Sequence, residues 1–380
     1  MNKELPKICK IQYGYPFDSS KFSDSEGIPI IRIRDVVRGY SETFTTEECS
    51  EDYIVNNGDM LIGMDGEFNI AHWKGGRAYL NQRVCKLIPG NEADGLYLYY
   101  FMPKALKAIE DKTPFVTVKH LSAKELNKVV VPLPDMQEQR RIGTSLQKID
   151  ELITMRKEQI AKLDELVKAR FVEMFGDLAD PMCSWNVMKL VDACANTDDI
   201  KCGPFGTQLS KDEYQSDGVA VWEIPQINSR FRTKPTHYLS VDKAFQLEAY
   251  SIIPGDIAMS RKGNVGKCAV FPSDFENGII HSDVLRIRVD SIKAHPVFVM
   301  HQLHYSRSVQ HQIELVSSGA IMAGINVTKL KQIQIHLPPL ELQEKFASFV
   351  EQTNKTKLTI QASLDKLEVM KKALMQEYFG

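Results

Sequence analysis

The chain has 380 residues, which predicts about two or three domains large enough to bury a core. Its hydrophobic content of 43% and charged content of 25% are those of an ordinary globular protein, and a net charge of −2 indicates no partner class. A membrane span, an export signal at residues 1–6 and a disulfide or zinc framework are not expected, because apolar runs are short and the seven cysteines are scattered. We expect a cytoplasmic protein with no metal and no cofactor of its own.

The first part of the chain passes from strand-like to helical patterns in a definite order. Glycine and proline mark the turns, and short β-rich runs lie between them. In chain order the elements are a Pro-Phe turn (15–18), an apolar strand-like run (28–36), a Gly-Asp turn entering a strand (57–62), a glycine-bearing polar loop (65–69), a β-rich run (78–88), a helical pattern (96–110), a Val-Thr-Lys-Leu segment (117–121) and a strand with a proline stop (129–134).

The second part repeats this series about 190 to 210 residues later, which indicates an internal duplication. One matching motif would carry little weight, but an ordered series over the whole length is strong support. Its members are a Pro-Phe turn (203–206), an apolar run (219–224), a Gly-Asp turn with a strand (254–259), a polar loop (261–267), a β-rich run (279–289), a helical pattern (296–315), an Asn-Val-Thr-Lys-Leu segment (326–330) and a strand with a proline stop (333–339).

After each proline stop the hydrophobic period changes from 2 to about 3.5. Asp135, with Glu138 three residues later, predicts an N-cap with a capping box, and the Phe-Gly pair that ends each stretch suits a helix C-cap. About 40 residues at 1.5 Å each give a rod of about 60 Å. Apolar residues spaced alternately by four and three predict a coiled-coil seam. The seam residues are Ile149, Ile153, Ile160, Leu163, Val167 and Met174 in the first stretch and Ile360, Leu364, Leu367, Leu374 and Tyr378 in the second.

The expected fold class is therefore α/β, with two similar α/β domains joined by two long helices. Two amphipathic helices in one chain most simply bury their seams against each other, so we expect an antiparallel coiled coil with pseudo-two-fold symmetry. The predicted α/β domains span 1–134 and 187–339, the helices span 135–176 and 340–380, and a polar linker spans 177–186.

The motifs of the common enzyme classes are missing from the sequence. There is no GxxxxGK[ST] phosphate loop, no GxGxxG after a strand, no Asn-Pro-Pro-aromatic motif, and no HExxH or GxSxG. The segment 263–267 has glycines and a lysine but lacks the phosphate-loop spacing, so a positively charged surface loop is favoured. His295, His301, His304 and His311 fall on one predicted helix, where a solvated face is favoured over a metal site.

What remains is binding chemistry, because polar glycine-containing loops lie at equivalent places in the two halves. They offer the side chains that contact base edges: Arg and Lys for guanine, and Asn and Gln for adenine. Each residue alone is explained as well by a solvated surface, but together the clusters favour a DNA-binding surface. The candidates are Arg32, Arg34, Asn69, Lys74, Arg77 and Lys119 in the first half, and Gln226, Asn228, Arg230, Arg232, Arg261, Lys262, Asn264, Lys267 and Lys329 in the second.

These segments resemble those of a known family, the specificity (S) subunits of type I restriction-modification systems, over essentially the whole chain. The most specific parts are the boundaries between strand and long helix. The resemblance rests on 131–142 as a strand-to-helix junction, on 326–330 with 333–339 and Gln343-Glu344 as its second copy, on 63–69 with 81–85 as one type of recognition-domain core, and on 203–206 with 261–267 as a second type.

The resemblance implies two target-recognition domains, each contacting one half of a bipartite, asymmetric site in double-stranded DNA. It also implies that the rods set the gap between the half-sites and dock two adenine-N6 methyltransferase (M) subunits. Those subunits would carry adenosylmethionine, and an ATP-dependent restriction (R) subunit would join them, so the chain itself would not be a catalyst. The polar loop is acidic at 65–67 and basic at 261–262, so the half-sites should differ.

Two alternatives stay open at this point. The chain could be a coiled-coil interaction scaffold with no DNA function, which the sequence separates only through the recognition-loop resemblance. It could also be a DNA-modifying enzyme with a divergent active site. Methylation of DNA by the pure chain would favour this second alternative.

Overall fold

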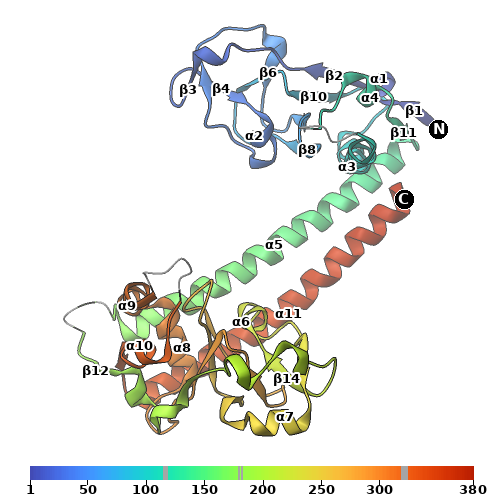
Figure 1. The fold of residues 1–380 in the computed structure, drawn as a ribbon. Helices are drawn as coiled ribbons and strands as arrows, with labels where there is room; N and C mark the ends of the chain where they lie inside the picture. Colours follow the sequence, from blue (N-terminus) through green and yellow to red (C-terminus); the bar gives the residue numbers. More distant parts are fainter. Residues whose placement is uncertain (114–118, 179, 181–182, 318–323) are drawn as a thin grey trace. The chain divides into compact units, whose positions relative to one another are not determined.

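The computed structural model describes residues 1–113, 119–178, 180, 183–317 and 324–380. The chain divides into two compact units: unit 1 is Met1–Glu158 with Gln361–Gly380, and unit 2 is Gln159–Ile360. Each unit contains an α/β part and sections of both long helices (Figure 1). Thr117 and Val118 of the predicted segment at 117–121, and Pro181 of the predicted linker, lie outside the described residues. Because the division cuts through both long helices, the predicted domain bounds stay predictions.

The α/β part of unit 1 holds two larger sheets and one strand pair. One sheet has the order β2-β10-β7-β8, the other has the order β3-β5-β4-β9-β6, and β1 pairs with β11. The strand pair β4–β9 is parallel. The bounds are β1 Asn2–Glu4, α1 Leu5–Ile8, β2 Cys9–Tyr13, β3 Phe22–Ser23, β4 Ile28–Ile31, α2 Ile33–Arg38, β5 Phe44–Thr45, β6 Ile54–Val55, β7 Met60–Gly63, β8 Asn69–His72, β9 Ala78–Leu80, β10 Val84–Pro89, α3 Gly95–Lys112, α4 Ala123–Asn127 and β11 Val130–Pro132.

Unit 2 repeats this topology except that its second sheet has no counterpart of β3. Its sheets have the orders β13-β20-β17-β18 and β15-β14-β19-β16, β12 pairs with β21, and β14–β19 is parallel. The bounds are β12 Asn186–Lys189, β13 Ile200–Cys202, β14 Val219–Trp222, α6 Ile224–Asn228, β15 His237–Leu239, α7 Val241–Gln246, β16 Ser251–Ile252, β17 Ile257–Ser260, β18 Cys268–Val270, β19 Gly278–Ile280, β20 Val284–Ile287, α8 Pro296–Tyr305, α9 Arg307–Ser317, α10 Val327–Lys331 and β21 Gln334–Leu337.

Strand register shows which residues of the two units are equivalent. Gly63 of β7 pairs with Val84 of β10, and Ser260 of β17 pairs with Val284 of β20. Gly14 and the corresponding Gly203 both follow the first strand of their sheet. A Cβ at Gly14 would lie 2.0 Å from the Asn81 carbonyl oxygen, and one at Gly203 would lie 2.3 Å from the His281 carbonyl oxygen. Only glycine permits this approach, so both copies keep it.

Three sequence expectations about local structure were wrong in whole or in part. The run 28–36 is a strand only to Ile31, because Asp35 accepts a hydrogen bond from the backbone N–H of Arg32 at 2.9 Å and starts the helix α2. The predicted helix at 296–315 is two helices that break at Ser306. His301 is only 6% exposed, so the expected solvated histidine face does not hold for this residue.

The two long helices are α5, Met136–Phe175, and α11, Leu340–Phe379. The N-cap prediction is confirmed, because Asp135 accepts from the Glu138 N–H at 2.8 Å. Glu138 does not complete the predicted capping box; its carboxylate pairs with Arg141 at 2.6 Å. The glycine C-cap of α5 is also confirmed, since Gly176 has φ 76° and donates to the Val172 carbonyl at 2.8 Å.

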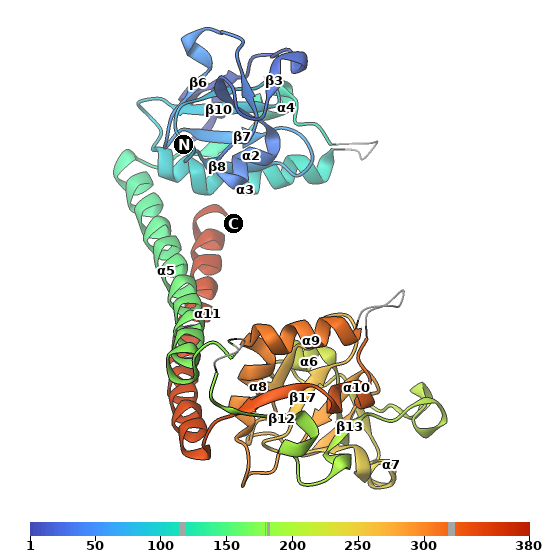
Figure 2. The same cartoon turned by 90° about the vertical axis from the view of Figure 1, so that its left-hand side faces the viewer.

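The helices α5 and α11 lie side by side and run antiparallel (Figures 1 and 2). Their ion pairs show the direction, because the partner number on α11 falls as the number on α5 rises. In unit 1 Asp150 pairs with Lys371 at 2.6 Å, and in unit 2 Asp164 pairs with Lys357 at 2.6 Å. None of the predicted seam residues is exposed. In the part of the chain that the structure describes, no helix is long and apolar enough to span a bilayer.

Candidate nucleic-acid interface

Unit 1 has a polar hollow where its parallel strands end. The strands β4 and β9 are parallel, so their carboxyl ends meet at one edge, which in open α/β sheets is where ligands bind. Arg32 follows β4, and Asn81, Gln82 and Arg83 follow β9. We call these four residues the strand-end site. They lie in a cavity of about 420 Å³ lined by Phe17, Ser19, Phe22, Arg32, Ile33, Arg34, Asn81, Gln82 and Arg83.

The guanidinium groups of this hollow are held in different ways. Arg32 is exposed. The Arg83 side chain is 51% exposed; its Nε lies 3.6 Å from Asp65, and its Nη1 lies 3.3 Å from the ring of His120. The Arg34 side chain is 53% exposed; its Nη2 lies 3.5 Å from the Thr43 hydroxyl and its Nε lies 3.7 Å from Asp35. Arg32 and Arg83 present donors to solvent from the ends of β4 and β9, and Arg83 does so from an anchored position.

The equivalent edge of unit 2 carries carboxylates and histidines. By the register of β14 with β19, Glu223 takes the place of Arg32, and His281, Ser282 and Asp283 take the places of Asn81 to Arg83. Glu223 pairs with the ring of His237 at 2.8 Å. Asp283 pairs with Lys262 at 2.8 Å. Acceptors therefore stand in unit 2 where unit 1 has donors.

The two units contain the same ion pair with its sign reversed. The backbone N–H of Met64 donates to the Arg83 carbonyl at 3.0 Å, and that of Arg261 donates to the Asp283 carbonyl at 2.9 Å, so these positions match. The next loop residue is Asp65 in unit 1 and Lys262 in unit 2. The pair is Asp65–Arg83 at 3.6 Å in one unit and Lys262–Asp283 at 2.8 Å in the other.

Three residues predicted to contact DNA make side-chain hydrogen bonds within their own unit. Gln226 is 1% exposed; its amide oxygen accepts from the Glu223 N–H at 3.1 Å, and its amide nitrogen donates to the Lys234 carbonyl at 3.0 Å. Lys119 donates to the Glu110 carbonyl near the end of α3, and Lys329 donates to the Val316 carbonyl near the end of α9, both at 2.9 Å. These lysines cap helix C-termini, where a positive charge is favourable.

Three other predicted residues, Asn69, Arg230 and Arg232, also have contacts within the chain. The side-chain amide of Asn69 donates to the Glu67 carbonyl at 3.0 Å, and Arg232 donates to the Ser229 carbonyl at 3.1 Å. Arg230 has φ 53° and lies 3.5 Å from Asp164 of α5. Asn228 is half-buried, and its side-chain oxygen has no hydrogen-bond partner among the described residues.

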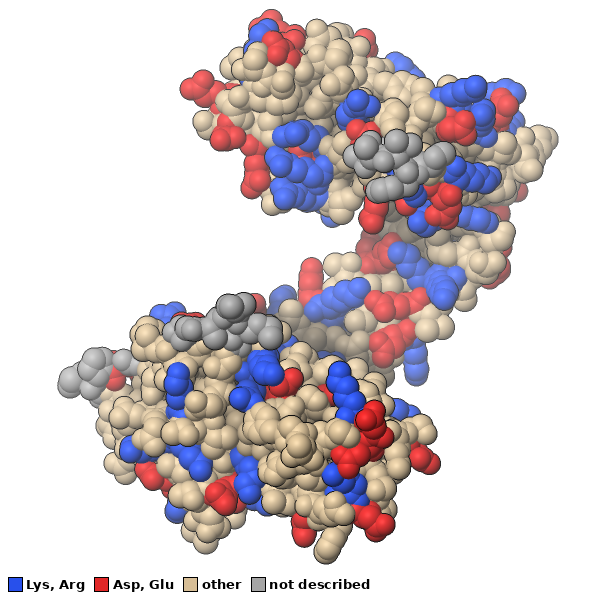
Figure 3. Space-filling model, in the orientation of Figure 1, with Lys and Arg blue, Asp and Glu red and all other residues tan. Residues whose placement is uncertain are grey.

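The predicted basic loop of unit 2 is partly a structural feature. The Arg261 guanidinium lies 4.7 Å from the centre of the Phe205 ring and donates to the Ile325 carbonyl at 3.3 Å. Lys267 is half-buried, whereas Lys262 and Asn264 are exposed, as are Lys74 and Arg77 in unit 1. On the face drawn in Figure 3, Lys and Arg are interspersed with Asp and Glu over both units. On this face, therefore, local clusters and not a broad basic field are available for contact with DNA.

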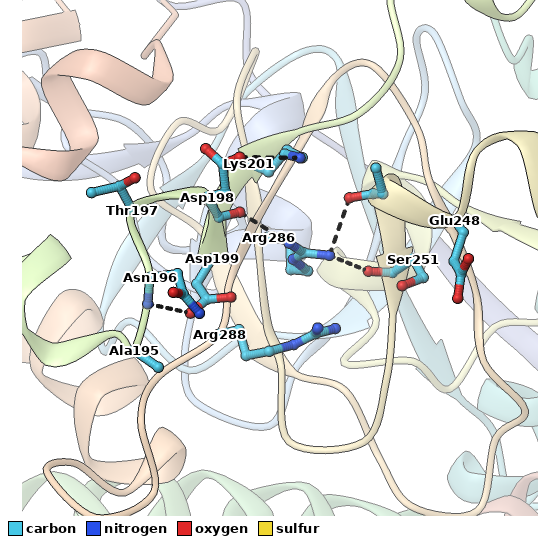
Figure 4. A pocket seen from close by; sticks show the side chains of 11 residues that line it. Ala195, Asn196, Thr197, Asp198, Asp199, Lys201, Glu248, Ser251, Arg286 and Arg288 are labelled. Carbon is cyan, nitrogen blue, oxygen red and sulfur yellow. Dashed lines mark hydrogen bonds and ion pairs between the residues drawn. The ribbon is translucent and has the colours of Figure 1, made fainter.

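A larger hollow in unit 2, of about 810 Å³, surrounds a buried arginine (Figure 4). Arg286 is 4% exposed and donates to the carbonyls of Ser251 at 2.7 Å and Asp198 at 3.2 Å. Burial, with the nearby charge of Arg288, lowers its pKa from the ordinary value. Lys86 is its counterpart in unit 1 and donates to the Ile54 carbonyl at 2.9 Å. We therefore assign this group to bracing of the fold.

Sequence reasoning missed the most informative residues of the strand-end site and of the equivalent edge of unit 2. Arg83, Glu223 and Asp283 were not among the candidates, although Arg83 lay within the segment 81–85 that carried the family resemblance. The internal duplication could have revealed these residues, because a comparison of matching positions in the two halves shows the reversed charges. Over the described part of the chain, no group of three or more His, Cys, Asp or Glu residues is placed to hold a metal ion.

Comparisons with known proteins agree with this geometry. A family model for the type I restriction modification DNA specificity domain matches residues 1–165 and again 184–369. The chain is 26% identical over 374 residues to the type I restriction enzyme EcoBI specificity subunit of Escherichia coli, covering 92% of this chain and 78% of that protein. It is 22% identical over 377 residues to the MjaVIII specificity subunit of Methanocaldococcus jannaschii, covering 91% and 87%.

Solved structures show the same fold. The crystal structure of a type I restriction-modification S subunit from M. genitalium superposes with a TM-score of 0.65 at 13% identity, covering 100% of this chain and 96% of that one. A chain from a study of complex assembly and conformational transition in the type I R-M system gives a TM-score of 0.56 at 18% identity, with 100% and 97% covered.

Proposed function

Because the chain belongs to the type I restriction-modification DNA specificity family, we propose that it is the non-catalytic subunit that recognises a bipartite, asymmetric DNA site. One observation supports this above the others: two units of the same topology carry opposite charges at the same strand-end positions, Arg83 and Asp283. Two similar folds with different side chains suit two half-sites with different bases.

The proposal includes docking of two M subunits, and of R subunits for restriction, along the long helices. Several large apolar side chains of these helices point to solvent, which marks a surface for a protein partner. In unit 1, Leu152 and Met155, three residues apart on α5, are 41% and 53% exposed, and Val369 of α11 is 70% exposed. In unit 2, Leu166 of α5 is 48% exposed. Shielding of these side chains by a partner would remove the cost of leaving them in water.

The test of function is a map of methylated adenines. We expect co-expression of the chain with its M subunit to give methylation at one bipartite, asymmetric motif, and expression of either protein alone to give none. Methylation of DNA by the pure chain with adenosylmethionine would support the enzyme alternative instead. A methylation pattern that is the same with and without the chain would support the scaffold.

The test of docking uses surface substitutions. Deletion of 340–380 is unsuitable, because Phe346 and Val350 of α11 belong to the core of unit 2. We expect Leu152→Glu with Met155→Glu to reduce co-purification of M at least tenfold without unfolding either unit. Phe245→Glu is the matched control, since Phe245 is 76% exposed on α7. Equal retention of M by both variants would place docking elsewhere.

A further inference from the structure

We infer that the strand-end site of unit 1 contacts a guanine through Arg32 and Arg83, and that unit 2 disfavours guanine at its equivalent site. This inference deepens the proposed function and rests on it. It assigns a base to a particular place in the fold, at the carboxyl ends of a parallel strand pair.

The donors of unit 1 fit the edge of guanine. Guanine presents two acceptors, O6 and N7, in the major groove, and arginine donates to both with its planar fork. Arg32 and Arg83 line one cavity of about 420 Å³ together with Asn81 and Gln82. Their backbones follow β4 and β9, which pair in parallel, so the sheet sets the separation of the two arginines.

Arg83 is also positioned before any DNA arrives. Asp65 lies 3.6 Å from its Nε and pairs on its other side with His120. This contact orients the guanidinium, while half of the side chain stays exposed. A side chain that is already oriented loses less rotamer freedom on binding. The acidic residue of the loop at 65–67 thus acts as a support for a basic contact and not as a contact itself.

The acceptors of unit 2 exclude the same contact. Glu223 and Asp283 stand at the places of Arg32 and Arg83, and their side chains are 17% and 28% exposed. Carboxylate oxygens repel guanine O6 and N7 but accept from the amino group of cytosine or adenine. Asp283 is supported by Lys262 at 2.8 Å, as Arg83 is by Asp65.

The reversed sign of the two ion pairs supports a role in base recognition more strongly than either pair does alone. An ion pair that only braced the loop against the strand end would be equally strong in either sense. In both units, however, the residue after the second parallel strand has the same sign of charge as the residue after the first parallel strand. Arg83 and Arg32 are both positive in unit 1, and Asp283 and Glu223 are both negative in unit 2. The loop residue, Asp65 or Lys262, serves as the counter-ion. The sign of the charge at the strand ends is therefore the property that distinguishes the two units.

The experiment maps methylation by the complex of this chain with its M subunit, using Arg32→Lys and Arg83→Lys. Lysine keeps the positive charge and hence the general attraction to phosphates, but it lacks the planar fork. We expect discrimination at one guanine to fall about 10- to 100-fold in one half of the motif, with the other half unchanged. Competition binding with duplexes altered at that base pair measures the same ratio.

The control is Arg38→Lys, because Arg38 is exposed at the end of α2, pairs with Glu42 at 3.4 Å and does not line the cavity; it should leave the motif unchanged. An unchanged motif in both test variants, or relaxation in both halves, would overturn the inference. If Arg83→Lys lowers the melting temperature, the motif of the Arg32→Lys variant is the test, because Arg32 is not part of the ion pair with Asp65. A wild-type complex with no bipartite motif would instead refute the proposed function.

Discussion

Two buried glutamines join the long helices to their α/β parts. Gln139 of α5 is 1% exposed; its amide oxygen accepts from the Asp94 N–H at 2.9 Å, and its amide nitrogen donates to the Glu92 carbonyl at 3.1 Å. Gln343 is fully buried near the start of α11 and accepts from the His295 N–H at 2.9 Å. Both segments were recognised from the sequence as helix starts, but the role of the glutamines becomes clear only from these partners.

We expect Gln343→Ala to destabilise unit 2 by about 2 to 4 kcal/mol, because it leaves the His295 N–H and the Pro338 carbonyl buried without partners. Urea unfolding measures the loss. Gln352→Ala, at an exposed position of the same helix, is the control and should change stability by less than about 0.5 kcal/mol. Equal effects of the two substitutions would show that the buried hydrogen bonds contribute nothing.

His301 makes unit 2 sensitive to acid. Burial disfavours the charged ring and lowers the pKa of His301 to about 4, while its Nδ1–H donates to the Val297 carbonyl at 2.8 Å. The unfolded chain binds the proton with a pKa near 6.5, so stability is complete above that pH and falls as the pH drops toward 4. We expect His301 to contribute a loss of about 2 kcal/mol between pH 7 and pH 5 in urea unfolding. His295, His304 and His336, whose pKa values burial also lowers, add to this loss. His301→Asn should remove most of the contribution of His301; an unchanged pH dependence would contradict this origin.

Residue type and spacing could not predict which polar side chains are free. Gln226, Lys119 and Lys329 were candidate base or phosphate contacts because their types suit DNA. Each instead bonds to a backbone group of its own unit. Such bonds depend on where neighbouring loops end, and the sequence pattern does not contain that information.

At the scale of elements, the end of each long helix is a hydrophobic anchor. Phe175, at the end of α5, contacts Phe298 with ring centroids 4.7 Å apart and Phe346 at 5.6 Å, within unit 2. Phe379, at the end of α11, contacts Tyr97 at 5.3 Å within unit 1. The 3.5-residue period predicted the helices and their seam, whereas these aromatic contacts depend on the sheets and helices beside them.

We expect Phe175→Ala to cost about 3 to 5 kcal/mol, since it opens a cavity among packed aromatic rings. Denaturant unfolding of the full chain measures the effect, and we expect the midpoint of the unfolding transition of unit 2 to fall. Val172→Ala is the control, because Val172 is 50% exposed on the same turn of α5. A cost for Phe175→Ala no larger than that of the control would show that the end of α5 is not an anchor.

At the scale of the whole molecule, the duplication made the architecture predictable. An ordered repeat and two amphipathic stretches were enough to predict two α/β parts and an antiparallel helix pair. The strand-end sites were not predictable in the same way, because their residues come together only through the parallel pairing of β4 with β9 and of β14 with β19. Arg32 and Arg83 are far apart in the sequence, and only the sheet makes them neighbours.

The reversed ion pairs lead to a prediction for the two units together. Asp65→Lys combined with Arg83→Asp gives the ion pair of unit 1 the charge order found in unit 2. Lys262→Asp combined with Asp283→Lys gives the ion pair of unit 2 the charge order found in unit 1. Because the Lys262–Asp283 pair is partly exposed, its exchange should change stability by less than about 1 kcal/mol. The exchange in unit 1 also removes the contact of Asp65 with His120 and should cost more. We expect each exchange to alter one half of the methylation motif of the complex with M.

The number of bases between the half-sites should stay constant in both exchanges, because neither touches α5 or α11. The single substitution Asp65→Lys is the control: it sets a lysine beside Arg83 and should weaken binding without giving a new motif. Methylation mapping separates these outcomes. A change of both halves by one exchange, or a change of the spacing, would mean that the two units do not recognise DNA independently.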